Sequence, residues 1–240
     1  MKNKKKIIAF TSIILLLILG IFLYKSFSTP KLAELDPSWG MGTRVTKSVS
    51  NDRSYEWYVD QWSTGRNAAL NCGPSSMAMV AKWLDEDTTI NTEDIADKYI
   101  PDEAIYNGVH TLTLAMWLDE YGINSRWLDG VSEEALIKEL DEGNIIIVGL
   151  DTKYLTYNSN NKQRVGEYFC IDPSKNTYHY VIAKGYKVVD DKLYFETYDP
   201  GSYYILYEDG ELIGKDRYYL GSEFIEAANM YFPDVLVFEE

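Results

Sequence analysis

The apolar pattern of the sequence changes near residue 143, and this change constrains the fold more than any other feature. Before it, apolar residues recur at helical spacing, as in the stretch from Pro74 to Leu84. This spacing predicts helices over 74–84, 92–99, 111–121 and 132–142. After it, short runs rich in β-branched and aromatic residues predict strands over 145–150, 178–187, 192–198, 203–207 and 235–238, with a hairpin turn at 188–191 and a last helix over 222–229. Helices followed by antiparallel strands indicate an α+β domain, which we place at residues 51–240.

An uncharged, mainly apolar run of 18 residues, 7–24, follows three lysines, Lys4 to Lys6. Its length is near the lower limit for a transmembrane helix, which needs about 17 to 25 residues. Lysines before such a run keep its N-terminal end in the cytoplasm, so the rest of the chain is expected outside the cell. We therefore expect residues 1–28 to be an N-terminal transmembrane anchor, with a cleaved signal peptide and a secreted product as the alternative. Residues 29–50, which contain several Pro and Gly, are expected to form a linker.

The charge of the chain excludes one large class of partner. The net charge is −14, and beyond residue 28 there are 18 Lys and Arg against 37 Asp and Glu. Such an acidic body would be repelled by phosphate backbones, so we expect no binding to nucleic acid. Two Cys and two His are too few for a disulfide scaffold or a zinc ribbon, and neither a metal nor another cofactor is expected.

Cys72 is the candidate nucleophile. It precedes Gly73 and Pro74 at the predicted start of a helix, where free N–H groups and the helix dipole stabilise a thiolate. The alternative interpretations are a small buried cysteine or, in an oxidising exterior, a disulfide with Cys170.

A thiolate nucleophile needs a base that later acts as an acid, and the sequence offers only His110 and His179. His179 stands at the head of a predicted strand, and Asp199 stands at the end of the next predicted strand. If these two strands pair antiparallel, the two residues come close together. We therefore predict that Asp199 orients His179 and that His110 lies at a helix entry. The alternative for Asp199 is a turn residue before Pro200 and Gly201.

Three elements resemble the C39-like cysteine peptidases of the papain-like fold over about residues 55–230. In chain order they are Asn71-Cys72-Gly73-Pro74-Ser75-Ser76, then His179-Tyr180-Val181-Ile182 followed by Gly185-Tyr186, then Tyr198-Asp199-Pro200. The resemblance implies N-terminal helices packed on a C-terminal antiparallel sheet, and a Cys-His-Asp triad. It also implies an upstream Gln that donates to the oxyanion, for which Gln61 is the matching residue, 11 positions before Cys72. An ordinary loop glutamine is the alternative for Gln61.

These features predict a membrane-tethered extracellular cysteine peptidase that acts on peptides or proteins. Two alternatives stay open: a cell-wall amidase or endopeptidase using the same triad, and a catalytically silent binding module. The chain departs from family members fused to peptide exporters because it has one membrane segment and no phosphate-binding loop with Gly, Lys and Ser or Thr. Their specificity for double-glycine leader peptides is therefore not transferred to it.

Overall fold

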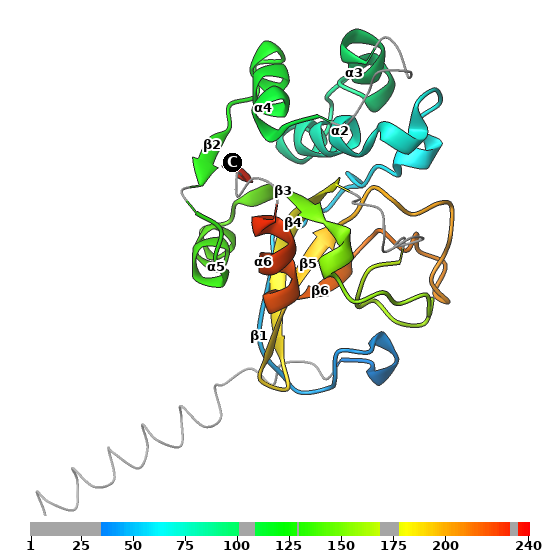
Figure 1. Ribbon diagram of the computed structural model, residues 1–240, viewed down its shortest axis with the longest axis vertical. Helices are drawn as coiled ribbons and strands as arrows, with labels where there is room; N and C mark the ends of the chain where they lie inside the picture. Colours follow the sequence, from blue (N-terminus) through cyan, green and yellow to red (C-terminus); the bar gives the residue numbers. More distant parts are fainter. Residues whose placement is uncertain (1–34, 101–108, 129, 169–177, 231–234) are drawn as a thin grey trace, which may run out of the picture. The chain divides into compact units, whose positions relative to one another are not determined.

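An antiparallel sheet lies at the centre of the fold (Figure 1). The computed structural model describes residues 35–100, 109–128, 130–168, 178–230 and 235–240. Within them the sheet follows the order β2-β7-β3-β4-β5-β6, and β1 pairs with β4 as well. The strands are β1 Val45–Ser50, β2 Arg126–Leu128, β3 Ile145–Asp151, β4 Tyr178–Val189, β5 Lys192–Tyr198, β6 Arg217–Leu220 and β7 Val235–Phe238. The helices are α2 Cys72–Leu84, α3 Thr92–Tyr99, α4 Thr111–Glu120, α5 Glu133–Asp141 and α6 Gly221–Asn229. The predicted combination of helices with an antiparallel sheet is confirmed.

Helices cover the sheet on both faces because the strand residues alternate between two apolar cores. In β3, Ile145 and Ile147 pack in a core with residues of α2 and α4. The residues between and after them, Ile146 and Val148, pack in a second core with residues of α5 and α6. The same alternation in β4 places Tyr180 on the side of α2 and Val181 on the side of α6. The near-continuous apolar run of β3 therefore reflects burial on both faces.

The helix boundaries follow the capping residues of the sequence. The side chain of Asn91 accepts a hydrogen bond from the backbone of Asp94, and Ser132 does the same with Ala135. These two N-caps confirm the predicted starts of α3 and α5. Helix α2 begins at Cys72, two residues earlier than the predicted start, so Cys72 is itself the first helical residue.

Strand β4 is long enough to pair with two strands along one of its sides. Its first half pairs with β3, and its second half pairs with β1 in a register that sets Ser50 opposite Gly185. A Cβ at Gly185 would lie 2.2 Å from the Val49 carbonyl oxygen, so glycine is needed for this close approach. Residues 45–50, which fall within the predicted linker, are thus part of the sheet.

Other differences from the predicted elements concern short segments. The predicted strand over 203–207 does not form, because Tyr203 and Tyr204 adopt φ of 52° and 60° and the chain turns there. Strands β2 and β6 were not predicted, and they are only three and four residues long. The predicted hairpin turn is narrower than expected, with Val188 and Val189 still in β4.

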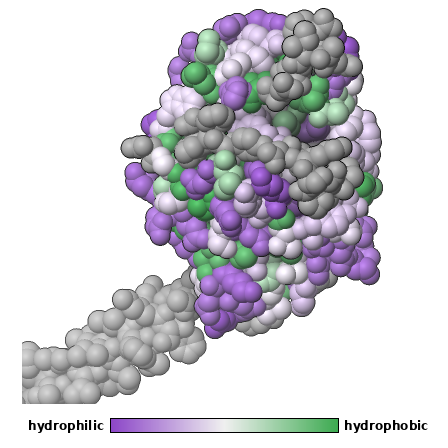
Figure 2. Space-filling view, viewed as in Figure 1, coloured by the Kyte–Doolittle hydropathy of each residue, from purple (hydrophilic) through white to green (hydrophobic). Residues whose placement is uncertain are grey.

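No helix among the described residues is long and apolar enough to cross a membrane. The predicted anchor at residues 1–28 lies outside the described residues. On the face drawn in Figure 2, hydrophobic residues are interspersed with hydrophilic ones. The exposed large hydrophobic side chains are likewise spread over several elements, including Leu112, Trp127 and Tyr204.

A buried charge network ties β4 and β5 to the segment that follows β1. The fully buried ammonium of Lys184 lies 2.7 Å from Glu196, 2.9 Å from Asp52 and 2.8 Å from Asp216. Burial alone would raise the pKa of Glu196, but Lys184 and Lys187 lower it to about 2. The network therefore balances charges that the fold removes from water.

Replacing Lys184 by Met should strongly destabilise the fold, because Glu196 would lose its closest buried partner. We expect a loss of about 3 to 5 kcal/mol in the free energy of unfolding, measured by urea denaturation at neutral pH. Lys98→Ala, which breaks an exposed ion pair with Glu120, is the control and should change this free energy little. Because the folded pKa of Glu196 lies below its unfolded value, its contribution is present above the unfolded pKa and is lost as the pH falls towards 2. An equal response of the two variants would contradict this account.

Candidate active site

Cys72 stands at the first turn of α2, directly against the central strand β4. The helix approaches closely because residue 73 is glycine: a Cβ there would lie 3.1 Å from Leu114 and 3.7 Å from Tyr180. The thiol is partly exposed and unbonded to any other sulfur. The backbone N–H groups of Gly73 and Tyr180 face its sulfur and help to lower the pKa of the thiol. The sulfur is therefore surrounded by donors that favour a thiolate.

His179 and Asp199 meet at one end of the sheet, as predicted from the strand order. The Nε2 atom of His179 lies 2.6 Å from Oδ1 of Asp199. Asp199 is fully buried, and its Oδ1 also accepts a hydrogen bond of 2.7 Å from the backbone N–H of Gly201. Asp199 therefore contacts His179 and begins the turn at the same time, so both interpretations of this residue fit its contacts.

The three side chains change one another's pKa. Burial alone would raise the pKa of the Cys72 thiol, but the hydrogen bond and positive charge of His179 bring that pKa below its ordinary value. Burial alone would lower the pKa of His179, but the charge of Asp199 and hydrogen bonds to Asp199 and Cys72 raise it well above its ordinary value. Burial alone would raise the pKa of Asp199, but the charge of His179 leaves it lowered. Together these shifts favour a Cys72 thiolate beside a His179 imidazolium.

The ring of His179 is held in the orientation that this pair requires. Because Nε2 faces Asp199, Nδ1 is the nitrogen that remains to contact the Cys72 sulfur. His110, by contrast, is the exposed N-cap residue of α4. The structure thus brings together the predicted histidine, carboxylate and thiol. Cys170, the other partner of the alternative disulfide, lies outside the described residues.

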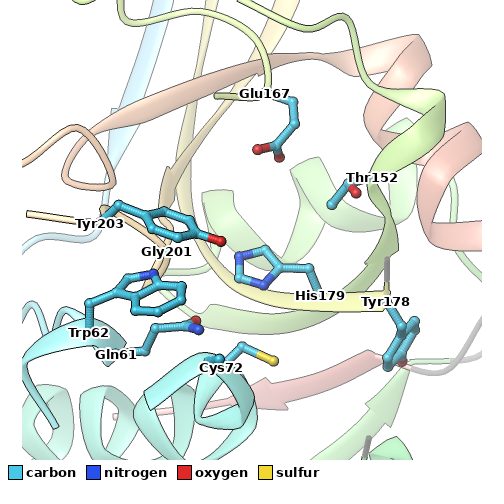
Figure 3. A pocket seen from close by; sticks show the side chains of 10 residues that line it. Gln61, Trp62, Cys72, Thr152, Glu167, Tyr178, His179, Gly201 and Tyr203 are labelled. Atoms are coloured by element: carbon cyan, nitrogen blue, oxygen red, sulfur yellow. The ribbon is translucent and has the colours of Figure 1, made fainter. Parts of the chain in front are cut away.

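Gln61 lies beside Cys72 in the same pocket (Figure 3). It is buried, and its backbone N–H donates a hydrogen bond of 2.8 Å to the carbonyl of Pro200. One proton of its Nε2 goes to the carbonyl of Ala68 at 3.0 Å, which leaves a second Nε2 proton. The longer chain separation from Cys72 is accommodated by a short 3₁₀ turn, Ala68–Leu70, between the two residues.

Several residues that the sequence did not indicate complete the pocket. Trp62 and Tyr203 stack with ring centroids 3.9 Å apart and form one side, with Tyr178 on the other (Figure 3). The Tyr204 hydroxyl donates a hydrogen bond to the Trp62 carbonyl, which fixes this stack. The remaining lining residues are Ala69, Thr152, Glu167 and Gly201. Tyr203 and Tyr204 adopt the left-handed backbone conformation at this wall. Because this conformation is rare for tyrosine, no pattern in the sequence predicts it.

The side chains support nucleophilic chemistry on a carbonyl group. A thiol, an imidazole and an amide donor line one pocket, and these are the groups that acyl transfer through a thioester uses. Within the described parts of the chain, no group of three or more His, Cys, Asp or Glu side chains is arranged to hold a metal ion.

Comparisons with known proteins place the chain in a family. The model of the Peptidase_C39 like family matches residues 57–218, about two thirds of the chain. A crystal structure of a candidate C39-like peptidase from Bacillus anthracis has the same fold, with a TM-score of 0.53 and 13% sequence identity over 81% of this chain and 98% of that one. No curated protein matches the sequence. The matched region contains Gln61, Cys72, His179 and Asp199, so the whole candidate site lies inside it. The chain therefore belongs to the Peptidase_C39 like family.

Proposed function

We propose that this protein is a cysteine peptidase that cleaves peptide bonds with Cys72, His179 and Asp199 as its triad. The observation that carries the proposal is the 2.6 Å contact between His179 and the fully buried Asp199, with Cys72 lining the same pocket as this histidine. A protein that only binds a ligand does not need a buried histidine–carboxylate pair beside a thiol. Family membership supports peptidase activity independently.

The first half of the reaction forms a thioester. The Cys72 thiolate attacks the carbonyl carbon of the scissile bond, and the negative charge moves to the carbonyl oxygen. The backbone N–H of Cys72 and the Nε2 group of Gln61 stabilise that oxyanion. His179 then gives its proton to the amide nitrogen, the C–N bond breaks, and the amine product leaves.

The second half regenerates the enzyme. His179, now neutral, takes a proton from water while the water oxygen attacks the thioester carbon. The C–S bond breaks, the acid product leaves, and Cys72 is again a thiolate beside a His179 imidazolium. Asp199 keeps the imidazole ring aligned and stabilises its positive charge in both halves.

We further propose that the peptidase acts outside the cell and is tethered by residues 7–24. Three lysines followed by an uncharged run of 18 residues support this location. The strongly acidic body is consistent with a peptide or protein substrate rather than nucleic acid.

Cys72→Ser should reduce hydrolysis of a diverse peptide library by roughly 10³-fold or more, because a serine hydroxyl is not ionised by this site. Wild-type activity should follow a bell-shaped pH profile. Its acid limb should lie below the ordinary thiol range and its alkaline limb above the ordinary imidazole range, as the pKa directions of Cys72 and His179 require. Cys170→Ser is the matched control and should keep full activity. Activity in Cys72→Ser equal to wild type would remove Cys72 as the nucleophile, and cleavage of peptidoglycan alone would indicate a cell-wall enzyme.

His179→Ala should reduce the rate of hydrolysis about 100-fold or more, because the group that serves as both acid and base would be lost. His110→Ala should keep most of the activity, since His110 lies exposed at the start of α4. Steady-state kinetics on folded protein, checked by circular dichroism, measures both. The reverse pattern would mean that His110 is the catalytic histidine.

Asp199→Asn should lower the rate roughly 10- to 100-fold with little change in substrate affinity, because the variant keeps an acceptor for His179 but loses the charge. Asp199→Ala should be slower still, since the ring then also loses its hydrogen-bond partner. The measurement is the rate of Cys72 alkylation by iodoacetamide near neutral pH, expressed per folded molecule. If both variants lose thermal stability but their folded fractions react like the wild type, Asp199 serves only the turn.

A further inference from the structure

The two carboxylate oxygens of Asp199 have different partners. Oδ1 accepts hydrogen bonds from His179 at 2.6 Å and from the Gly201 backbone at 2.7 Å. Oδ2 accepts a hydrogen bond of 2.7 Å from the hydroxyl of Tyr219. The bond that turns a carboxylate has a broad energy minimum, so its rotation is set by its partners rather than by its own torsion. Tyr219 is the partner that holds the oxygen turned away from the histidine.

We propose that Tyr219 is a positioning residue, whose buried hydroxyl holds Asp199 ionised and turned so that one oxygen faces His179. This inference rests on the proposed function, because it acts through the triad. Tyr219 does not line the pocket in which Cys72 and His179 meet. Its proposed effect on the reaction is therefore indirect, through the carboxylate of Asp199.

The sheet fixes the place of the Tyr219 hydroxyl. Tyr219 lies opposite Phe195 in the pairing of β5 with β6, and Phe195 and Asp199 project from the same face of the chain because they are four residues apart. The ring is 1% exposed and stacks on Phe224 with centroids 5.9 Å apart. A packed ring on a paired strand presents its hydroxyl to Asp199 with little freedom to move.

The hydroxyl also lies 3.4 Å from Oε2 of Glu167, a buried carboxylate in the pocket wall. A tyrosine has one hydroxyl proton, and the shorter distance assigns it to Asp199. The other polar or charged groups near Asp199 come from several elements. They are His179 on β4, Tyr203 and Tyr207 in the loop after β5, and Tyr58, whose hydroxyl donates a hydrogen bond of 2.7 Å to the Asp199 carbonyl. Arg217 on β6 is buried and acts electrostatically on Tyr219 and Glu167.

Loss of the hydroxyl should move the triad's titration in a definite direction. The proton of the Tyr219 hydroxyl stabilises the charged form of Asp199. Without it, protonation of Asp199 becomes easier, and His179 loses its ionised partner at a higher pH. The thiolate–imidazolium pair should then form only at a higher pH than in the wild type.

The test compares Tyr219→Phe with Tyr186→Phe in a chain that carries Cys170→Ser. Tyr186 is a buried tyrosine of β4 whose hydroxyl donates a hydrogen bond of 2.6 Å to Asp141. Its variant therefore loses a similar hydrogen bond away from the triad. The measurement is the pH profile of iodoacetamide alkylation of Cys72 per folded molecule, together with the thermal unfolding of each variant. For Tyr219→Phe we expect the acid limb to move upward by about one pH unit and the rate below it to fall about tenfold. The Tyr186→Phe profile should coincide with that of the wild type.

Two other outcomes have distinct meanings. If Tyr219→Phe loses thermal stability but keeps the wild-type alkylation profile, Tyr219 only packs, and the inference is overturned while the proposed function stands. If Cys72 in the wild type already titrates like an ordinary thiol, near pH about 8.5, the proposed function and the role of Tyr219 are both overturned.

Discussion

The candidate site depends on an ion pair removed from water, His179 with Asp199. Asp199 is fully buried, and burying a carboxylate costs several kcal/mol unless donors replace its water. Here the imidazolium, one backbone N–H and one hydroxyl replace it. The strand pairing brings the imidazole and the hydroxyl to the carboxylate, since β4, β5 and β6 are neighbours in the sheet, and the turn after β5 supplies the N–H of Gly201. The sheet register is therefore as much a part of the site as the side chains are.

The backbone around Asp199 is held as firmly as its carboxylate. The Asp199 N–H donates a hydrogen bond of 2.8 Å to the Gly214 carbonyl, and the Tyr58 hydroxyl donates to the Asp199 carbonyl. Glycine is needed at residue 214 because a Cβ would lie 1.9 Å from the Asp199 carbonyl oxygen. The next carbonyl, that of Pro200, accepts from the Gln61 N–H. One short segment thus positions both the carboxylate of the proposed triad and the candidate oxyanion donor.

Much of this architecture could be predicted from the sequence because it rests on local patterns. Cys72 before a Gly-Pro pair indicates a helix start, and polar caps such as Ser132 mark helix boundaries. Runs of apolar residues likewise indicate β3, β4 and β5. Only the order of these strands was needed to bring His179 near Asp199, and this part of the prediction needed no knowledge of packing.

The rest could not be predicted because it depends on contacts between distant segments. Strand β1 is polar and half exposed, and it becomes a strand only because the long β4 offers it a free side. Tyr219 is one of 20 tyrosines, and nothing local distinguishes the one whose hydroxyl reaches Asp199. The turn at Tyr203 is held by stacking on Trp62, which is more than 100 residues away along the chain.

The position of β7 in the sheet has a consequence for when the site can exist. This strand, Val235–Phe238, is the last one among the described residues, yet it lies between β2 and β3 inside the sheet. Strand β3 in turn pairs with the half of β4 that contains His179. Contacts between residues so far apart form late in folding, because closing a long loop costs entropy before any contact is gained. A chain in which β7 has not yet paired therefore carries Cys72 on a helix but lacks the completed sheet beside His179, so we expect the candidate site to form only once this strand has joined the sheet.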